Sequence, residues 1–134
     1  MKILVIDAQG GGLGKQLIAA IKEKMPCAAV TAVGANAAAT AAMLKAGADQ
    51  AATGENAVIV ACRKADVIVG PLGIAIADSL LGEITPAMAL AVVQSPAKRV
   101  LLPLNRCDNI IVGVSEHSLG GLVQEAVDTI SRMA

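Results

Sequence analysis

The sequence predicts an α/β fold, in which helices cover both faces of a doubly wound, mostly parallel β-sheet of about five strands. Runs of branched aliphatic residues alternate with segments in which apolar residues recur at helical spacing. The chain has 134 residues, 55% of them hydrophobic and 16% charged, so it can bury a core of its own. No linker or shift in composition divides it, and we expect one domain over residues 1–134.

The first half of the chain alternates strand and helix twice. Residues 3–6, a continuous run of branched apolar residues, predict a strand that is buried on both faces. Apolar residues at helical spacing over 13–25 predict a helix, which a proline ends. Residues 28–33 predict the second strand, and Asn36 is a suitable N-cap for an alanine-rich helix over 37–45.

The middle of the chain has a less regular pattern. Residues 57–64 suit a strand or a buried helix, and we favour the helix because 66–70 (Asp-Val-Ile-Val-Gly) is the better strand. Thr85, followed by a proline, marks the start of a helix over 86–94.

The last third of the chain predicts two strands and a helix. The strands lie at 99–104 and 110–114, and Ser118 caps a final helix whose apolar residues run from Leu122 to Met133. Because the link between these strands is short, we expect one antiparallel pair at an edge of the sheet. The whole pattern is Rossmann-like, with three layers.

Composition excludes several partners. Lys and Arg equal Asp and Glu at 11 each, and no Phe, Tyr or Trp is present, so the chain cannot build stacking platforms for single-stranded nucleic acid. An acidic residue interrupts the first apolar stretch, and no apolar run approaches the ~20 residues of a membrane helix. We therefore expect no nucleic acid, no signal peptide and no membrane partner.

The cysteine count and the mean hydropathy bear on location and assembly. Three cysteines without close spacing favour reduced thiols in the cytoplasm, and with one histidine we expect no metal site. The high mean hydropathy predicts a homo-oligomer that buries apolar surface between subunits.

The stretch AQGGGLGK, residues 8–15, lies where the first strand meets the first helix, a place where α/β folds hold phosphate groups. It fills two of the three glycine positions of the dinucleotide fingerprint, where Gln9 stands first. It also fills two of three in the spacing of short-chain dehydrogenases, where Ala8 stands first. The acidic residue expected after the second strand is missing, because 34–36 is Gly-Ala-Asn, and Asn36 is left to recognise a ribose.

The same stretch partly matches the phosphate-binding loop of ATPases. Lys15 is correctly placed, but Gln16 replaces the serine or threonine that would hold magnesium. The loop is most similar to the deviant form in ParA-type ATPases, whose extra lysine is replaced by Gly10, so ATP hydrolysis is not expected. Lys15 opposes the helix dipole unless an anion is bound. The alternative is a tight turn whose glycines serve packing alone.

Loops after four predicted strands should meet at one edge of the sheet, where ligands bind in parallel α/β folds. Turns are needed at that edge in any parallel sheet, which is the simpler explanation. The candidate ligand contacts are Asp7, Gln9, Gly10, Gly11, Gly12, Leu13, Gly14, Lys15, Gly34, Asn36, Gly70, Pro71, Gly73, Asn105 and Arg106.

Several titratable residues have two interpretations each. Asp7 is a candidate base, but we favour hydrogen bonds to N–H groups of the glycine loop. Cys107, beside an arginine, is a nucleophile or, as we favour, an inert thiol. His117 is expected at the surface. Asp78 and Glu83 are paired carboxylates or, as we favour, part of a solvated turn.

The segments IDAQGGGLGK, NAAATAAMLKAGAD, ATGENA, ADVIVGP, GEITPAMA and SPAKRVLLPLNRC resemble a short bacterial family known only as a domain of unknown function with Rossmann-like character. The resemblance covers nearly the whole length. It implies an independent small protein, and it supplies no catalytic residue.

We therefore expect a cytoplasmic protein that binds a small phosphorylated ligand, either NADP or NAD or an adenine nucleotide, and acts as a sensor or accessory protein. NADP-like and adenine nucleotides rank first, because no acid follows the second strand. Two alternatives stay open. One is a small NADP-linked oxidoreductase, although no tyrosine is present to donate a proton. The other is an oligomerisation module that binds no ligand.

Overall fold

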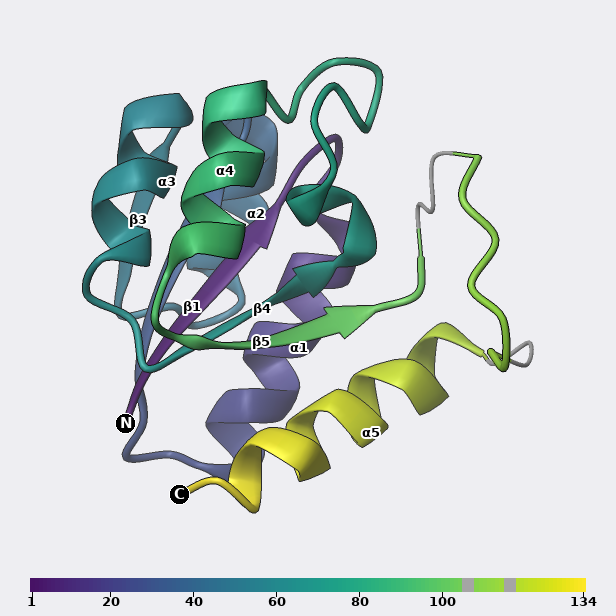
Figure 1. Ribbon diagram of the computed structural model, residues 1–134. Coiled ribbons are helices and arrows are strands. Elements are labelled where there is room, and N and C mark those ends of the chain that lie inside the picture. The colour runs from purple at the N-terminus through teal and green to yellow at the C-terminus, as the bar shows by residue number, and fades with distance from the viewer. Residues whose placement is uncertain (105–107, 115–117) are drawn as a thin grey trace.

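The computed structural model describes residues 1–104, 108–114 and 118–134. Its centre is a five-stranded sheet in the order β3-β2-β1-β4-β5, in which every neighbouring pair is parallel (Figure 1). The strands are β1 (Lys2–Asp7), β2 (Ala29–Gly34), β3 (Gln50–Thr53), β4 (Val67–Pro71) and β5 (Lys98–Leu102). The parallel α/β sheet is Rossmann-like, as the sequence predicts.

Helices pack on both faces of this sheet. They are α1 (Gly12–Lys24), α2 (Ala37–Lys45), α3 (Glu55–Cys62), the short 3-10 helix η1 (Leu72–Ala75), α4 (Pro86–Gln94) and α5 (Leu119–Ser131). The first core cluster joins α1, α2 and α5 to one face, and the second joins α3 and α4 to the other (Figure 1). In β1, Ile3 and Val5 belong to the first cluster, and Leu4 and Ile6 belong to the second. The expectation that this strand is buried on both faces is confirmed.

The predicted antiparallel edge strand at 110–114 is wrong. The side chains of Ile110 and Val112 are exposed, and the segment pairs with no described strand. Asp108 and Gly113 have φ angles of 66° and 90°, and such left-handed residues turn the chain away from an extended path. β5 is therefore an edge of a sheet that is parallel throughout.

The fifth strand is instead β3, which the sequence pattern does not predict. Alanine is a weak strand former, and two of the four residues of β3 are alanine. Most of the strand is also exposed. Pairing with β2 creates the strand, because Ala32 lies opposite Ala51 and Gly34 lies opposite Thr53 in parallel register. The helix favoured behind it is confirmed as α3.

The strand order reverses between β1 and β4. The chains that follow these two strands leave the sheet toward opposite faces, and folds of this kind have a crevice at that point. Gly70 sits at the junction, where a Cβ atom would collide with the carbonyl oxygen of Ile6. The two strands approach closely because residue 70 has no side chain.

The change Gly70→Ala is expected to lower the free energy of unfolding by about 1–3 kcal/mol, because the added methyl group meets backbone of β1. Gly120→Ala is the matched control. Gly120 lies in the first turn of α5, where a Cβ would meet nothing within 4 Å. Alanine there should leave stability unchanged or raise it by up to about 1 kcal/mol. Urea denaturation measures both variants, and equal stabilities would contradict the close approach.

Candidate functional site

The loop between β1 and α1 makes a tight turn. Gln9 and Gly11 have φ angles of 53° and 73°, in the left-handed region, and Gly11 is the N-cap of α1. The N–H of Gly11 donates to the carbonyl oxygen of Ala8 at 3.0 Å, which closes the turn. The first residue of α1, Gly12, is exposed.

The carboxylate of Asp7 holds this loop in place. Oδ1 accepts a hydrogen bond from the N–H of Ala8 at 2.8 Å, and Oδ2 accepts one from the N–H of Gly14 at 2.7 Å. The residue is only 4% exposed, so water does not compete for these bonds. The structure thus matches the interpretation of Asp7 that the sequence favoured, in which it bonds N–H groups of the glycine loop.

Two opposing effects set the proton affinity of Asp7. Burial raises the pKa of its carboxyl above the ordinary value, and the two backbone hydrogen bonds lower the pKa in part. The negative charge of Glu83 adds to the upward shift of the pKa. The carboxyl of Asp7 therefore holds its proton more readily than an exposed carboxyl does.

The glycines of the loop fall into two groups. Gly11 and Gly14 serve packing, since a Cβ on Gly11 would lie 2.9 Å from Cα of Ala39, and one on Gly14 would lie 2.9 Å from Cβ of Asp7. Gly10 and Gly12 have neither a left-handed φ nor any heavy atom within 4 Å of a Cβ. Neither backbone conformation nor packing requires glycine at those two positions.

Three backbone N–H groups in the same loop have no acceptor. Of the residues that the structure describes, none accepts a hydrogen bond from the N–H of Gly10, Gly12 or Leu13. The N–H groups at the start of a helix point outward along its axis and carry partial positive charge. Lys15 is exposed in the same first turn and forms no ion pair with the described residues.

Asn36 joins the end of β2 to the glycine loop. Its Oδ1 accepts from the N–H of Ala39 at 2.8 Å, which makes it the N-cap of α2, as predicted. Its Nδ2 donates to the carbonyl oxygen of Gln9 at 2.9 Å and to Oε2 of Glu83 at 2.6 Å. The other carboxylate oxygen of Glu83, Oε1, accepts from the N–H of Gln9 at 2.9 Å.

Glu83 is the residue of this site that sequence reasoning missed. The favoured interpretation placed Asp78 and Glu83 in a solvated turn, and Asp78 is exposed, but Glu83 is half-buried against the glycine loop. Gln9 and Glu83 are 74 residues apart. No local spacing could have indicated the contact, because the fold alone brings these segments together.

The loop that carries Glu83, residues 76–85, has an unusual backbone. Asp78, Leu80 and Leu81 have φ angles of 64°, 56° and 58°. Left-handed φ in residues other than glycine costs of order 1–3 kcal/mol each and persists only where the surroundings impose it. Here the buried side chains of Leu80 and Ile84 anchor the loop, so the position of Glu83 is fixed.

Some of the remaining residues predicted to contact a ligand are packed inside the fold, and the others lie outside the described ranges. Gly34 is buried, and a Cβ there would collide with the side chain of Thr40. Pro71 ends β4, and the carbonyl oxygen of Gly73 accepts a hydrogen bond from Oγ of Ser79. The predictions for Asn105, Arg106, Cys107 and His117 concern residues that lie outside the described ranges.

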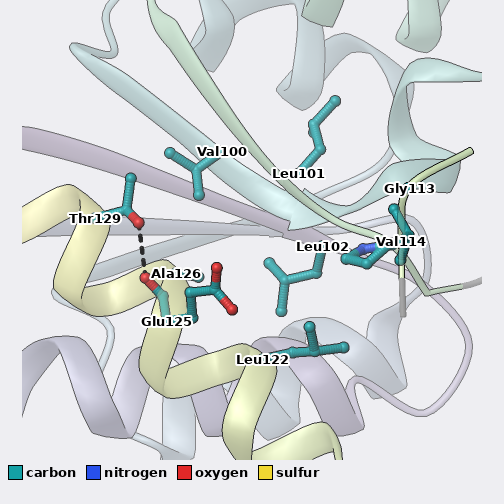
Figure 2. A pocket seen from close by; sticks show the side chains of 10 residues that line it. Val100, Leu101, Leu102, Gly113, Val114, Leu122, Glu125, Ala126 and Thr129 are labelled. Atoms are coloured by element: carbon teal, nitrogen blue, oxygen red, sulfur yellow. Dashed lines mark hydrogen bonds between the residues drawn. The ribbon is translucent and has the colours of Figure 1, made fainter. Parts of the chain in front are cut away.

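A hollow of about 330 Å³ lies between β5 and α5, and no residue of the glycine loop lines it (Figure 2). Of its lining residues only Glu125 and Thr129 have polar side chains, and Oγ1 of Thr129 donates to the carbonyl oxygen of Glu125 at 2.8 Å. No predicted contact lines it. A binding site needs convergent polar groups that fix a ligand, and this hollow offers one free carboxylate.

The described residues contain no group of three or more His, Cys, Asp or Glu that could hold a metal ion. None of the helices in the described ranges is both long enough and apolar enough to cross a membrane.

Comparison with known proteins identifies the family. The sequence profile described as "Domain of unknown function (DUF3842)" matches residues 2–134. The chain belongs to this family. The resemblance seen in the sequence is therefore confirmed, and the DUF3842 description assigns no activity.

Other comparisons add little. No curated protein sequence is significantly similar to this DUF3842 member. A dodecameric FMN-dependent UbiX-like decarboxylase from Escherichia coli O157:H7 is similar in structure, with a TM-score of 0.47 and 23% sequence identity. The similarity covers 99% of this chain and 76% of the decarboxylase chain. Both values are too low to transfer the cofactor or the assembly of the decarboxylase to this chain.

The pH dependence of stability should reveal the raised pKa of Asp7. The native state binds the proton of the Asp7 carboxyl more readily than the unfolded chain does. As pH rises from the ordinary carboxyl pKa through the raised pKa, the wild type should therefore lose stability relative to Asp7→Asn. Asp49 supplies a control of opposite sign. The hydrogen bond from Lys22 lowers the pKa of Asp49, so the wild type should gain stability relative to Asp49→Asn as pH rises from the lowered pKa through the ordinary one.

Chemical denaturation between pH 3 and pH 7 measures both differences. If both stability differences, wild type minus Asp7→Asn and wild type minus Asp49→Asn, changed with pH in the same direction, Asp7 would not be desolvated as described.

Proposed function

We propose that this protein binds the phosphate groups of a nucleotide or dinucleotide at the loop between β1 and α1. One observation carries the proposal: Gly10 and Gly12 have no structural need to be glycine, and their own N–H groups have no acceptor among the described residues. Glycine has a conformational cost at such positions, because it loses more backbone freedom on folding than any other residue. A ligand that approaches the backbone accounts for that cost, since a side chain would occupy its place.

The charge distribution around the loop suits a phosphate at its outer surface. The N-terminus of α1, a helix of 13 residues, presents the N–H groups of Gly12 and Leu13 to an anion. Lys15 follows Gly12 by three residues and so lies on the same exposed face of the helix. The Asp7 carboxylate accepts hydrogen bonds from the N–H groups of Ala8 and Gly14. It makes no bond to the N–H groups of Gly12 and Leu13, which stay available to a ligand.

The packing alternative explains only part of the pattern. It accounts for Gly11, Gly14, Gly34 and Gly70, each of which touches neighbouring atoms where a Cβ would stand. It gives no reason for Gly10 and Gly12. No observation favours the oxidoreductase alternative, since the described candidate base, Asp7, is committed to the loop. Cytoplasmic location and assembly into a homo-oligomer stay predictions.

The change Gly12→Val tests the proposal, because it should abolish binding without harming the free protein. A valine side chain at residue 12 extends into open space above the loop, where the phosphate would lie. The control is Gly120→Val, the same change in the first turn of α5. Thermal unfolding is measured with NAD, NADP, ADP, ATP and CoA, with and without magnesium.

At a hundred times its dissociation constant, a bound ligand adds about 2.7 kcal/mol to the stability of the wild type. We expect at least one member of the panel to stabilise the wild type and Gly120→Val, and to leave Gly12→Val unchanged. Equal stabilisation of all three proteins would place the ligand elsewhere. A panel without a stabiliser would overturn the proposal.

A further inference from the structure

We propose that Glu83 is the ribose-recognition residue of this site, and that it selects nucleotides with a free ribose diol over those with a 2′-phosphate. The inference rests on the proposed function and deepens it. It assigns a specificity-determining role to a residue that reaches the site from the loop between η1 and α4.

Glu83 stands at the end of β2, although it does not belong to that strand. In dinucleotide-binding folds an acidic side chain at the end of the second strand bonds the ribose hydroxyls. This chain has Gly34, an alanine and Asn36 there. The amide of Asn36 holds the carboxylate of Glu83, 47 residues later in the sequence, at 2.6 Å. The fold therefore supplies from another segment the acid that the local sequence lacks.

The hydrogen bonds leave the Glu83 carboxylate ready to accept two more. Each carboxylate oxygen can accept about two hydrogen bonds. Oε1 accepts one from the N–H of Gln9, and Oε2 accepts one from Nδ2 of Asn36. One further bond at each oxygen matches a vicinal diol, whose two hydroxyl groups donate side by side. The bonds already made fix the carboxylate in a single orientation.

The same carboxylate repels a phosphate at this end of the site. Glu83 and the buried Asp7 are near enough for their charges to interact, and the Glu83 charge raises the pKa of Asp7. A 2′-phosphate would add negative charge beside both groups, whereas the N–H groups of Gly12 and Leu13 would donate to the other phosphate groups of the ligand. The order of ligands suggested by the sequence, with NADP-like nucleotides first, is therefore reversed in this proposal.

The backbone of the 76–85 loop is consistent with a positioned Glu83. Leu80 and Leu81 adopt left-handed φ angles, and a hydrogen bond from the N–H of Ile84 to the carbonyl oxygen of Ser79 at 3.2 Å closes the loop. Strained residues of this kind concentrate at functional sites.

Binding of matched ligand pairs tests the inference. Calorimetry measures the affinities of the wild type for NAD and NADP, and for ADP and 2′-deoxy-ADP. We expect the wild type to bind NAD at least about tenfold more tightly than NADP. We also expect 2′-deoxy-ADP, which lacks the 2′-hydroxyl, to bind more weakly than ADP. In Glu83→Gln, which keeps the shape but removes the charge, both ratios should move toward one. Asp78→Asn, an exposed acid of the same loop, should behave as the wild type.

Each remaining outcome has a definite meaning. Binding of NADP as tightly as NAD by the wild type overturns the role of Glu83 and leaves the phosphate site intact. Ratios that stay unchanged in Glu83→Gln do the same. If that variant fails to fold, Glu83→Asp and the wild-type ratio decide the question. If the wild type binds no member of either pair, this inference is overturned. The proposed function still holds in that case if the wild type binds another phosphorylated ligand, such as CoA, and Gly12→Val does not.

Discussion

The architecture of the glycine loop depends on one buried carboxylate. Asp7 is the last residue of β1, and its carboxylate accepts hydrogen bonds from the N–H groups of Ala8 and Gly14. Both ends of the loop are therefore bonded to the same side chain. The hydrogen bonds partly offset the desolvation of the charge. Asp7 satisfies the donors of Ala8 and Gly14, whereas the N–H groups of Gly10 and Gly12 have no acceptor among the described residues. A short loop can thereby be held rigidly from within while some of its N–H groups make no hydrogen bond to the described residues.

Most of the fold could be predicted from the sequence because its determinants are local. Asn36, Thr85 and Ser118 accept hydrogen bonds from backbone N–H groups as helix caps at the positions expected. The failures occur where tertiary contacts decide. The alanines of β3 form a strand only because β2 pairs with them, and the apolar residues at 110–114 pair with no described strand.

The candidate site was predictable in outline and not in its chemistry. Residues 8–15 follow a strand and open a helix, so the phosphate-binding interpretation needed no distant contact. The sequence has no acid after β2, and no local pattern could indicate that Glu83 contacts Asn36 from a separate loop. The loop glycines could not be divided in advance either. Only the positions of Ala39 and Asp7 show that Gly11 and Gly14 are needed for packing.

The two outer strands of the sheet restrict how copies of this chain can associate. β3 has four residues, and β5 begins with Lys98 and Arg99, both exposed. Short strands and cationic side chains at a sheet border discourage edge-to-edge pairing, in which two sheets would merge into one continuous ribbon. The apolar residues Leu90 and Val93 are exposed on α4 instead. Any association of copies of this chain is therefore expected through helical surfaces, with each sheet confined to its own chain.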